Sequence, residues 1–459
     1  MSDFVEEEQL ELVERHALGR VAGLSTELSD VSEVEYRQLR LERVILVGVW
    51  FEGTEAEAQN SLSELAALAD TAGSEVLDVI MQRRSAPDLA TYIGSGKVKE
   101  LEELVRAHGA DTVICDGELT GAQLRNLEDQ VNAKVVDRTA LILDIFAQHA
   151  KSVEGKAQVE LAQLQYLKQR LRGWGGNLSR QVGGRASGGV GIGGRGPGET
   201  KIETDRRRIN TRIAILKRKL RDMDSTRELK RADRVRNRIP SVAIVGYTNA
   251  GKSSLLNRLT DAGVLVEDAL FATLDPTTRR STTSDGRVYT LTDTVGFVRR
   301  LPHDLVEAFA STLEESVHAD LLVHVVDGSD IDPMGQVAAV RKILSDIGAG
   351  DIKELMVINK IDQADEAVLI ELRHHLGRAI FCSALTGEGI EEVREAIEAS
   401  LPAPEVTVRV VLPYDRGDLL NRIHQESDLL SLEHLGEGTL VSARVHPELA
   451  AELKQYRAD

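Results

Sequence analysis

The sequence predicts an α/β protein with four folded parts that follow an acidic N-terminal segment. Three observations predict this fold class. Residues 43–140 alternate short apolar runs with amphipathic stretches, residues 141–239 hold two long helical stretches, and residues 240–402 open with an apolar run, a glycine-bounded loop and a helix. Such alternation is typical of a parallel sheet covered by helices on both faces. Residues 403–459 predict a small α+β domain.

Composition limits the class of protein. A chain of 459 residues, 42% of them hydrophobic, is long enough for about three domains with real cores. The two cysteines, Cys115 and Cys382, lie in apolar runs, which favours buried reduced thiols and excludes metal binding by cysteine. No apolar run approaches the length of a membrane span, and the acidic stretch 1–9 does not resemble a signal peptide. We therefore expect a cytoplasmic protein without a membrane span.

Charge is distributed unevenly along the chain. The net charge is -18, which by itself argues against nucleic acid as a partner. Residues 151–239 nevertheless hold 23 Lys and Arg against 9 Asp and Glu, a net charge of +14, so the rest of the chain carries -18 - 14 = -32. One strongly basic segment within an acidic protein predicts a local site for a polyanion.

The N-terminal α/β domain is expected over residues 43–140, after an acidic arm (1–42) to which we assign no role. Its expected strands are 44–50, 76–80, 112–115 and 134–136, and its expected helices are 55–71, 98–107 and 122–131. Within it, the loop 92–97 reads Tyr-Ile-Gly-Ser-Gly-Lys and opens a helix. Such a loop either binds a phosphate or an RNA backbone or is a plain turn, and both interpretations stay open.

A helical hairpin is expected over residues 141–239. The stretch 139–172 has apolar residues at helical spacing, and the stretch 206–238 has them alternately four and three apart, which is a coiled-coil period. These residues are Leu161, Leu164, Leu167 and Leu171 in the first helix, and Ile209, Ile213, Leu216, Leu220 and Met223 in the second. Two helices with narrow apolar stripes and one connection predict antiparallel pairing.

The connection between these helices is unusual. Residues 173–198 contain 12 glycines in 26 positions together with Arg180, Arg185 and Arg195. One interpretation is a flexible linker. The other is a slim cationic probe, since glycine permits close approach to a crowded surface and arginine binds phosphates and stacks on bases. Its place at the tip of a basic hairpin favours the probe, and the three arginines are then candidate RNA contacts.

A phosphate-binding loop begins the third part. Gly246, Gly251, Lys252 and Ser253 fit the pattern G-x-x-x-x-G-K-[ST], and they follow the apolar run 241–245. The glycines allow backbone N–H groups to point at phosphate oxygens at the start of a helix. Lys252 supplies a point charge for the β- and γ-phosphates, and the Ser253 hydroxyl suits Mg²⁺.

Three further motifs follow in the order found in GTPases. Asp293-Thr-Val-Gly296 can bind Mg²⁺ through water and the γ-phosphate through the Gly296 N–H. Asp362, in Asn359-Lys-Ile-Asp362, can accept two hydrogen bonds from guanine that adenine does not offer. Ser383 and Ala384 can offer N–H groups to guanine O6. The motifs predict these nucleotide contacts: Gly246, Tyr247, Thr248, Asn249, Ala250, Gly251, Lys252, Ser253, Asp293, Thr294, Val295, Gly296, Asn359, Lys360, Ile361, Asp362, Ser383, Ala384 and Leu385.

Over residues 43–402 the chain resembles the HflX family of ribosome-associated GTPases. The stretches that carry the resemblance are 92–97, 137–148, 155–163, 195–205, 271–275 and 293–297. The resemblance implies binding to the large ribosomal subunit, with the glycine-rich loop near the peptidyl transferase centre, and separation of stalled ribosomes under stress. We expect GTP and Mg²⁺ as substrate and cofactor, and a monomer away from the ribosome. The stretch 185–194 is similar to an insertion, and the C-terminal domain matches only loosely.

The resemblance also selects the switch residue. Spacing leaves Thr273, Thr277 and Thr278 open as the second Mg²⁺ ligand beside Ser253, and the resemblance implies Thr273. Phe271, Ala272, Thr273, Leu274 and Asp275 then join the nucleotide contacts, and Lys252, Thr273 and Gly296 form the catalytic set.

Phe297 stands where many GTPases have a glutamine that orients the attacking water, and phenylalanine offers no hydrogen bond. Either Phe297 packs in a core or it lies at the site. In both cases the glutamine is missing, so intrinsic hydrolysis is expected to be slow.

Two other functions compete with a GTP-driven ribosome factor. One is an RNA-binding or antiassociation factor that works without hydrolysis. The other is an ATP-driven RNA remodeller that uses the N-terminal domain, although that domain has no complete phosphate loop. A nonhydrolysable GTP analogue would distinguish the first of these from a GTPase.

Overall fold

The computed structural model describes residues 43–171, 197–236, 239–260, 270–284, 286–299, 310–402, 406–445 and 447–457. The acidic arm and the three candidate RNA contacts, Arg180, Arg185 and Arg195, lie outside these ranges, as does the apparent insertion 185–194. The chain divides into two compact units. Among the described residues, the first unit holds 43–223 and 270–271, and the second holds the remainder.

The first unit contains the predicted parallel sheet. Its four strands lie in the order β2-β1-β3-β4, and every neighbouring pair is parallel. They are β1 (Arg43–Trp50), β2 (Glu75–Arg83), β3 (Thr112–Cys115) and β4 (Lys134–Asp137). Helices follow the strands in alternation: α2 (Glu55–Thr71), α3 (Ser95–His108), α4 (Gly121–Val131) and α5 (Arg138–His149).

Helices cover both faces of this sheet. Ile45 and Val47 of β1 share a core with Leu101 of α3 and Leu127 of α4. Gly48, which points to the opposite face, lies against the side chain of Leu62 in α2. Helices α2 and α4 both begin with a capping box, in which a threonine N-cap and a Glu or Gln three residues later bond each other's backbone N–H groups. The predicted α/β domain is confirmed.

The first helix of the predicted hairpin is divided in two. The expectation of one helix over 139–172 is wrong, because α5 ends at His149 and α6 (Val153–Leu171) begins after a break. Ala150 adopts an extended conformation, and the Ser152 hydroxyl accepts a hydrogen bond from Gly155 N at 2.8 Å, which caps α6. The second helix, α8 (Pro197–Arg236), starts nine residues earlier than predicted.

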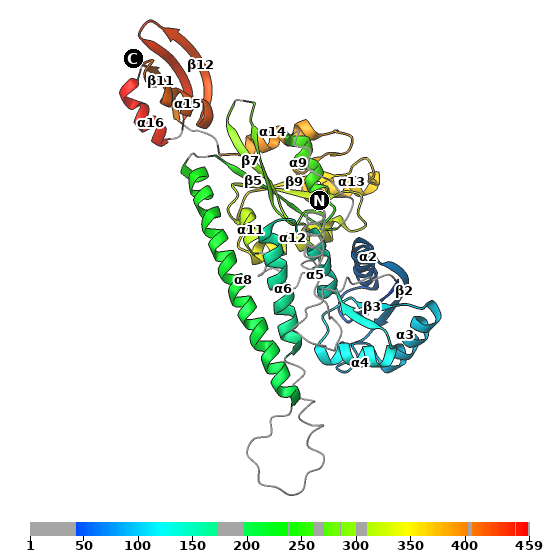
Figure 1. Ribbon diagram of the computed structural model, residues 1–459. Helices are drawn as coiled ribbons and strands as arrows, with labels where there is room; N and C mark the ends of the chain where they lie inside the picture. Colours follow the sequence, from blue (N-terminus) through cyan, green and yellow to red (C-terminus); the bar gives the residue numbers. More distant parts are fainter. Residues whose placement is uncertain are drawn as a thin grey trace, which may run out of the picture. The chain divides into compact units, whose positions relative to one another are not determined.

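The expected pairing of the two long helices is present. Figure 1 shows α6 beside α8 in antiparallel orientation. Their apolar stripes form a small core of Ala157, Leu161, Ile209, Ile213 and Leu216, with Leu164 and Leu220 at its edge. Arg212 of α8 also forms an ion pair with Glu160 of α6 at 2.6 Å. We call α6 and α8 the helical arm.

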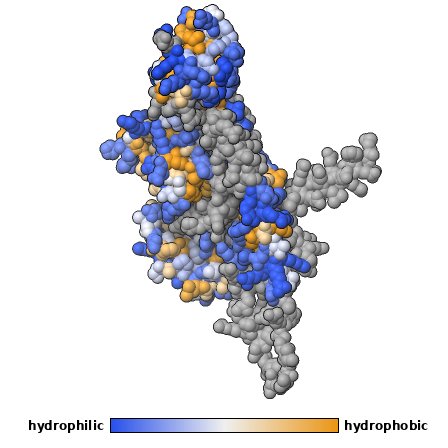
Figure 2. All heavy atoms as spheres, turned by 90° about the vertical axis from the view of Figure 1, so that its left-hand side faces the viewer, coloured by the Kyte–Doolittle hydropathy of each residue, from blue (hydrophilic) through white to orange (hydrophobic). Residues whose placement is uncertain are grey.

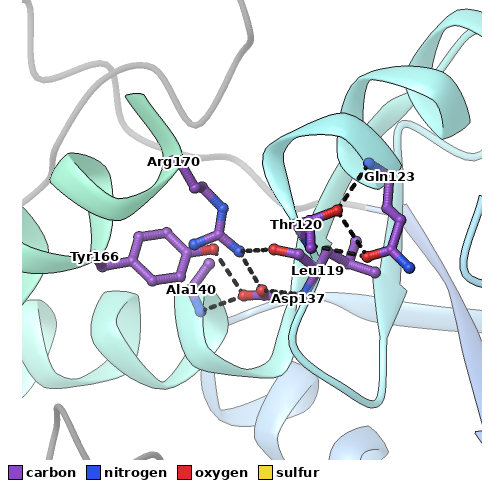
Figure 3. Close-up of polar contacts among 7 residues, drawn as sticks. All are labelled: Leu119, Thr120, Gln123, Asp137, Ala140, Tyr166 and Arg170. Carbon is purple, nitrogen blue, oxygen red and sulfur yellow. Dashed lines mark hydrogen bonds and ion pairs between the residues drawn. The ribbon is translucent and has the colours of Figure 1, made fainter. Parts of the chain in front are cut away.

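A buried polar cluster holds the end of α6 against the sheet (Figure 3). Asp137, at the end of β4, has no exposed surface and accepts hydrogen bonds from Tyr166 Oη at 2.7 Å and from the backbone N–H groups of Leu119 and Ala140 at 3.0 Å each. Arg170 forms an ion pair with Asp137, donates to Leu119 O at 3.1 Å and lies over the Tyr166 ring. We call these three side chains, Asp137, Tyr166 and Arg170, the clamp. Burial raises the pKa of Tyr166, so the phenol stays protonated.

The second unit contains a six-stranded sheet in the order β10-β9-β8-β5-β7-β6, parallel except for β6 against β7. Its strands are β5 (Ser241–Gly246), β6 (Thr277–Thr282), β7 (Val288–Asp293), β8 (Leu321–Asp327), β9 (Glu354–Asn359) and β10 (Ile380–Phe381). Its helices are α9 (Lys252–Thr260), α11 (Ala310–Val317), α12 (Pro333–Asp346), α13 (Glu366–Leu376) and α14 (Ile390–Ser400). The carboxyl ends of β5, β7 and β9 lie at one edge, where ligands bind in open α/β sheets.

The C-terminal residues form the predicted small α+β fold, a three-stranded antiparallel sheet in the order β11-β13-β12 with helices. Its elements are β11 (Val406–Leu412), α15 (Gly417–Glu426), β12 (Asp428–Leu435), β13 (Gly438–Val445) and α16 (Pro447–Leu453), followed by the 3₁₀ turn η1 (Lys454–Tyr456). The predicted last helix therefore ends three residues early as an α-helix.

Two predictions from composition can be checked on the described residues. Cys115 and Cys382 are both buried and free, as expected. No helix in the described part of the chain is long and apolar enough to cross a membrane. On the face shown in Figure 2, hydrophilic side chains are interspersed with smaller hydrophobic patches.

Candidate nucleotide site

The phosphate loop runs from the end of β5 to the start of α9, and its two glycines are required by space. A Cβ on Gly246, where φ is 154°, would lie 2.2 Å from Val325 O. A Cβ on Gly251, where φ is 88°, would lie 2.2 Å from Asn359 Nδ2. No other residue fits either position without moving the backbone of the neighbouring strand or the side chain of Asn359.

Lys252 is a buried cation at the centre of this loop. Its ammonium group donates to Tyr247 O at 2.8 Å. Burial lowers the pKa of Lys252 to about 8, although the carboxylate of Asp293 opposes this shift. An anion placed in the loop would restore the charged form of the lysine. The loop is therefore built to receive a phosphate.

Three oxygen-bearing side chains meet beside Lys252. Ser253 Oγ lies 2.8 Å from Thr273 Oγ1 and donates to Asp293 Oδ2 at 2.6 Å. The structure thus brings Thr273 to Ser253, as predicted, whereas Thr278 bonds Thr292 in the neighbouring strand at 3.0 Å. Asp293 has no exposed surface, and burial raises the pKa of its carboxyl group.

This oxygen cluster fits a hard divalent cation. Asp293 Oδ1 is buried and has no hydrogen-bond partner within the described chain, so one carboxylate oxygen remains to be satisfied. Hydroxyl and carboxylate oxygens together with phosphate oxygens are the ligands that Mg²⁺ prefers. Among the described residues no group of three or more His, Cys, Asp or Glu could hold a metal by itself, so phosphates would complete such a site.

The segment after β7 is hydrogen-bonded to the phosphate loop. Thr248 N donates to Phe297 O at 2.8 Å, and Phe297 N donates to Gly246 O at 3.1 Å. The Phe297 side chain is 1% exposed, so the interpretation that it packs in a core is confirmed. Gly296 lies against Thr248 and Lys252, since a Cβ there would be 2.7 Å from Thr248 Cγ2 and 3.0 Å from Lys252 Nζ.

The guanine end of the predicted site is built around Asn359. Its amide nitrogen donates to Ala250 O and its amide oxygen accepts from Ala384 N, both at 2.9 Å, so one side chain joins the phosphate loop to the loop after β10. Lys360 has a positive φ of 61° and pairs with Asp327 at 2.7 Å. Asp362 is exposed rather than buried, so its carboxylate is open to a base.

One prediction at this end does not hold in the structure. Ser383 N donates to Glu388 O at 2.9 Å, and Ala384 N donates to Asn359, so neither N–H group is left for guanine O6. The physical reason is that Glu388 O occupies the Ser383 N–H and the Asn359 amide occupies the Ala384 N–H, and sequence spacing reveals neither contact. Leu385, also predicted as a contact, exposes 70% of its surface.

Sequence reasoning missed Arg258 in α9. Its guanidinium donates to Ala384 O at 2.8 Å and also to Leu385 O, so it holds the backbone of the predicted guanine loop. The signal was its position six residues after Lys252, about 1.7 turns along the same helix.

Several predicted nucleotide contacts face the protein interior. Phe271 is 2% exposed, and its ring packs edge-on against Phe146 with centroids 4.6 Å apart, both residues belonging to the first unit. Its ring is therefore not available to a nucleotide, and Phe271 stays a predicted contact through its backbone alone. Leu274 and Val295 are buried, and Thr294 Oγ1 donates to Ile244 O at 2.8 Å. At these positions only backbone groups remain available to contact a nucleotide.

The loop 92–97 of the first unit behaves as a turn. Gly94 N donates to Gln82 Oε1 at 2.8 Å and Ile93 N donates to Thr91 O at 2.6 Å. Lys97 pairs with Glu100 at 2.7 Å. These contacts use donors that a phosphate would need, so they support the turn interpretation.

Comparisons with known proteins cover most of the chain. Family models described as "GTP-binding GTPase N-terminal", "GTP-binding GTPase Middle Region" and "50S ribosome-binding GTPase" match residues 59–147, 149–234 and 241–360. The GTPase HflX of Lacrimispora saccharolytica is 46% identical over 428 residues, covering 93% of this chain and 98% of the relative. The GTPase HflX of Escherichia coli is 44% identical over 387 residues, covering 84% and 88%.

The chain belongs to the HflX family. Its members are GTPases, and this chain is accordingly a GTP-hydrolysing enzyme. Among solved structures, the complex of SsGBP with GDP is similar at a TM-score of 0.43 and 25% identity, covering 78% of this chain and 98% of that one. As an HflX GTPase, this chain has a GTP-binding domain of the ribosome-binding class.

Proposed function

We propose that this GTPase binds the large ribosomal subunit and splits or rescues stalled ribosomes under stress, with hydrolysis slow in the free protein and stimulated by the ribosome. The observation that carries the proposal is the basic surface of the helical arm. Eight Lys and Arg residues in the described part of α8 are exposed: Arg206, Arg207, Arg208, Arg212, Lys217, Arg218, Lys219 and Arg221. They stand out in a chain whose net charge is -18.

Electrostatics supports RNA as the partner of this arm. Exposed Lys and Arg side chains release counterions when they neutralise phosphates, and this gives a strong, salt-dependent attraction. The sequence that connects α6 and α8 is rich in glycine, which would allow close approach to folded RNA, where arginines contact phosphates and bases. The match to a "50S ribosome-binding GTPase" model makes ribosomal RNA of the large subunit the expected polyanion.

The nucleotide site supports a switch that depends on GTP. Bound GTP and Mg²⁺ would order the segments around Thr273 and Gly296, because both lie beside the position of the γ-phosphate in the inferred site. Ser253 and Thr273 would hold the cation directly and Asp293 would hold it through water. When bound, the cation neutralises charge on the phosphates, while Lys252 and the Gly296 N–H stabilise the charge that develops on the γ-phosphate.

Cosedimentation of the full chain with isolated large subunits tests the proposal. With a nonhydrolysable GTP analogue bound, the affinity should fall steeply as the salt concentration rises. Replacing Arg206, Arg207, Arg218 and Arg221 together by glutamine should reduce the slope of log affinity against log salt by about 3, at roughly 0.7–0.9 per phosphate contact. An affinity that does not depend on salt would contradict an RNA contact and indicate a protein one.

A further inference from the structure

Thr248, the third residue of the phosphate loop, carries a hydroxyl group that makes no hydrogen bond within the described part of the chain. The side chain is 5% exposed, and Oγ1 has no hydrogen-bond partner in the described part of the chain. Buried polar groups are almost always hydrogen-bonded, and those that are not require an explanation such as a ligand or a catalytic role. Thr294, the other buried threonine of the nucleotide motifs, has a partner in Ile244 O.

The position of Thr248 indicates what its partner is. A Cβ on Gly296 would lie 2.7 Å from Thr248 Cγ2, 2.8 Å from Thr248 Cα and 3.0 Å from Lys252 Nζ, so these three residues enclose one place. Cγ2 is the Thr248 atom that faces Gly296, and Oγ1 is bonded to the same carbon, so the hydroxyl lies next to this place. The hydrogen bond from Thr248 N to Phe297 O, at 2.8 Å, fixes the residue there.

Hydrolysis requires a group of this kind at this place. In the nucleotide site proposed above, Lys252 and the Gly296 N–H face the γ-phosphate, and the attacking water must approach it from the side away from the β-phosphate. The Phe297 ring is buried and has no polar atom, so it cannot orient that water. A threonine hydroxyl both donates and accepts a hydrogen bond, as the amide of a glutamine does.

We infer that the Thr248 hydroxyl orients the attacking water against the γ-phosphate and is a catalytic residue of the free GTPase. The water oxygen forms a bond to the γ-phosphorus, and the bond from that phosphorus to the bridging oxygen breaks. GDP leaves with the electron pair of the broken bond, and the water protons go to the released phosphate and to solvent. Thr248 takes part through hydrogen bonds alone.

Single-turnover GTP hydrolysis by the full chain without ribosomes tests this inference. Thr248→Val keeps the shape of the side chain and removes the hydroxyl, and it should lower the rate constant at least about tenfold. Thr248→Ser keeps the hydroxyl and should stay within about threefold of the unaltered protein. Affinities for GTP and GDP, measured with fluorescent nucleotides, should change by less than about threefold in both variants, because the hydroxyl acts in the transition state.

Two further variants complete the test. Thr290→Val removes another buried hydroxyl, which bonds Pro240 O at 3.3 Å, and should leave the rate unchanged. Thr248→Ala should be as slow as Thr248→Val. The inference is overturned if Thr248→Val or Thr248→Ala hydrolyses GTP at the unaltered rate, if Thr248→Ser is as slow as Thr248→Val, or if rate and affinity fall in parallel.

Discussion

At the scale of single residues, most of the nucleotide site could be predicted because its chemistry depends on fixed spacing. Gly246, Gly251 and Ser253 lie where the phosphate-loop pattern places them, and Thr273 meets Ser253. The remaining positions depend on tertiary contacts, which the sequence pattern does not contain. Phe271 turned into a core beside Phe146, and Asn359 took the Ala384 N–H that spacing had assigned to guanine. A sequence pattern does not reveal which donor a neighbouring loop occupies.

Asp362 tests the choice of base. Its carboxylate is exposed, and we predict that it accepts two hydrogen bonds from guanine. Asp362→Asn should lower affinity for GTP at least about tenfold and improve affinity for xanthosine triphosphate, because the amide group can donate to the 2-oxo group of xanthine. Competition of GTP, XTP and ATP against a fluorescent guanine nucleotide measures this. An Asp362→Asn protein that still prefers GTP would refute the assignment.

Arg258 tests whether a residue outside the motifs supports guanine binding. Arg258→Ala removes two hydrogen bonds to the carbonyl groups of Ala384 and Leu385, and it should weaken GDP binding by about tenfold. Arg258→Lys can restore one of the two contacts and should give an intermediate affinity. Calorimetric titration with GDP measures both variants. An Arg258→Ala protein that binds GDP as tightly as the unaltered protein would show that Arg258 does not support guanine binding.

Lys252 gives the site a predictable pH dependence. Without nucleotide the pKa of Lys252 is lowered to about 8, and a bound phosphate raises it again. Binding above about pH 8 therefore takes up a proton, so affinity for GDP should fall as the pH rises through about 8, by up to about tenfold per pH unit. Titration calorimetry in buffers of different ionisation enthalpy measures that proton uptake. Guanosine, which has no phosphate, should show no such fall, and a constant GDP affinity would contradict the account.

At the scale of elements, strands and helices could be predicted from apolar periodicity, whereas breaks within helices could not. The run 139–172 has no sequence signal at the break near Ala150, because α5 is largely apolar and buried over residues 138–146 and α6 continues with apolar residues at helical spacing. The clamp could not be predicted from the sequence either. Asp137 precedes Tyr166 by 29 residues and Arg170 by 33, and the fold of the first unit brings it to these two neighbours on α6 (Figure 3).

The clamp should contribute strongly to the stability of the first unit. Arg170→Met leaves Asp137 buried without its cation and should reduce the free energy of unfolding by about 3–5 kcal/mol. Tyr166→Phe removes one hydrogen bond to that carboxylate and should cost about 1.5–3 kcal/mol. Urea denaturation, followed by circular dichroism, measures these changes. Arg207→Met breaks an exposed pair with Glu203 and should cost less than about 0.5 kcal/mol, and equal losses in all three variants would contradict the clamp.

At the scale of the whole molecule, charge distribution and the order of motifs were readable from the sequence. The strongly basic segment, with its net charge of +14, includes the helical arm, whose exposed α8 side chains carry much of that charge. The boundary between the two compact units lies within α8, and it could not be predicted because the helical pattern continues through residues 223–224. A continuous helix gives no local signal of where contacts change from one unit to the other.

The most direct test of the account is the rate of GTP hydrolysis with and without large ribosomal subunits. The free protein lacks a water-orienting glutamine, because the residue at that position is Phe297. The ring of Phe297 is buried in a core and has no polar atom. We expect slow turnover by the free chain and an increase of at least about tenfold when large subunits are added, a conservative bound on the contribution of a group supplied in trans. Small subunits at the same concentration should have little effect. Equal rates with and without large subunits would contradict the proposed activation by the ribosome.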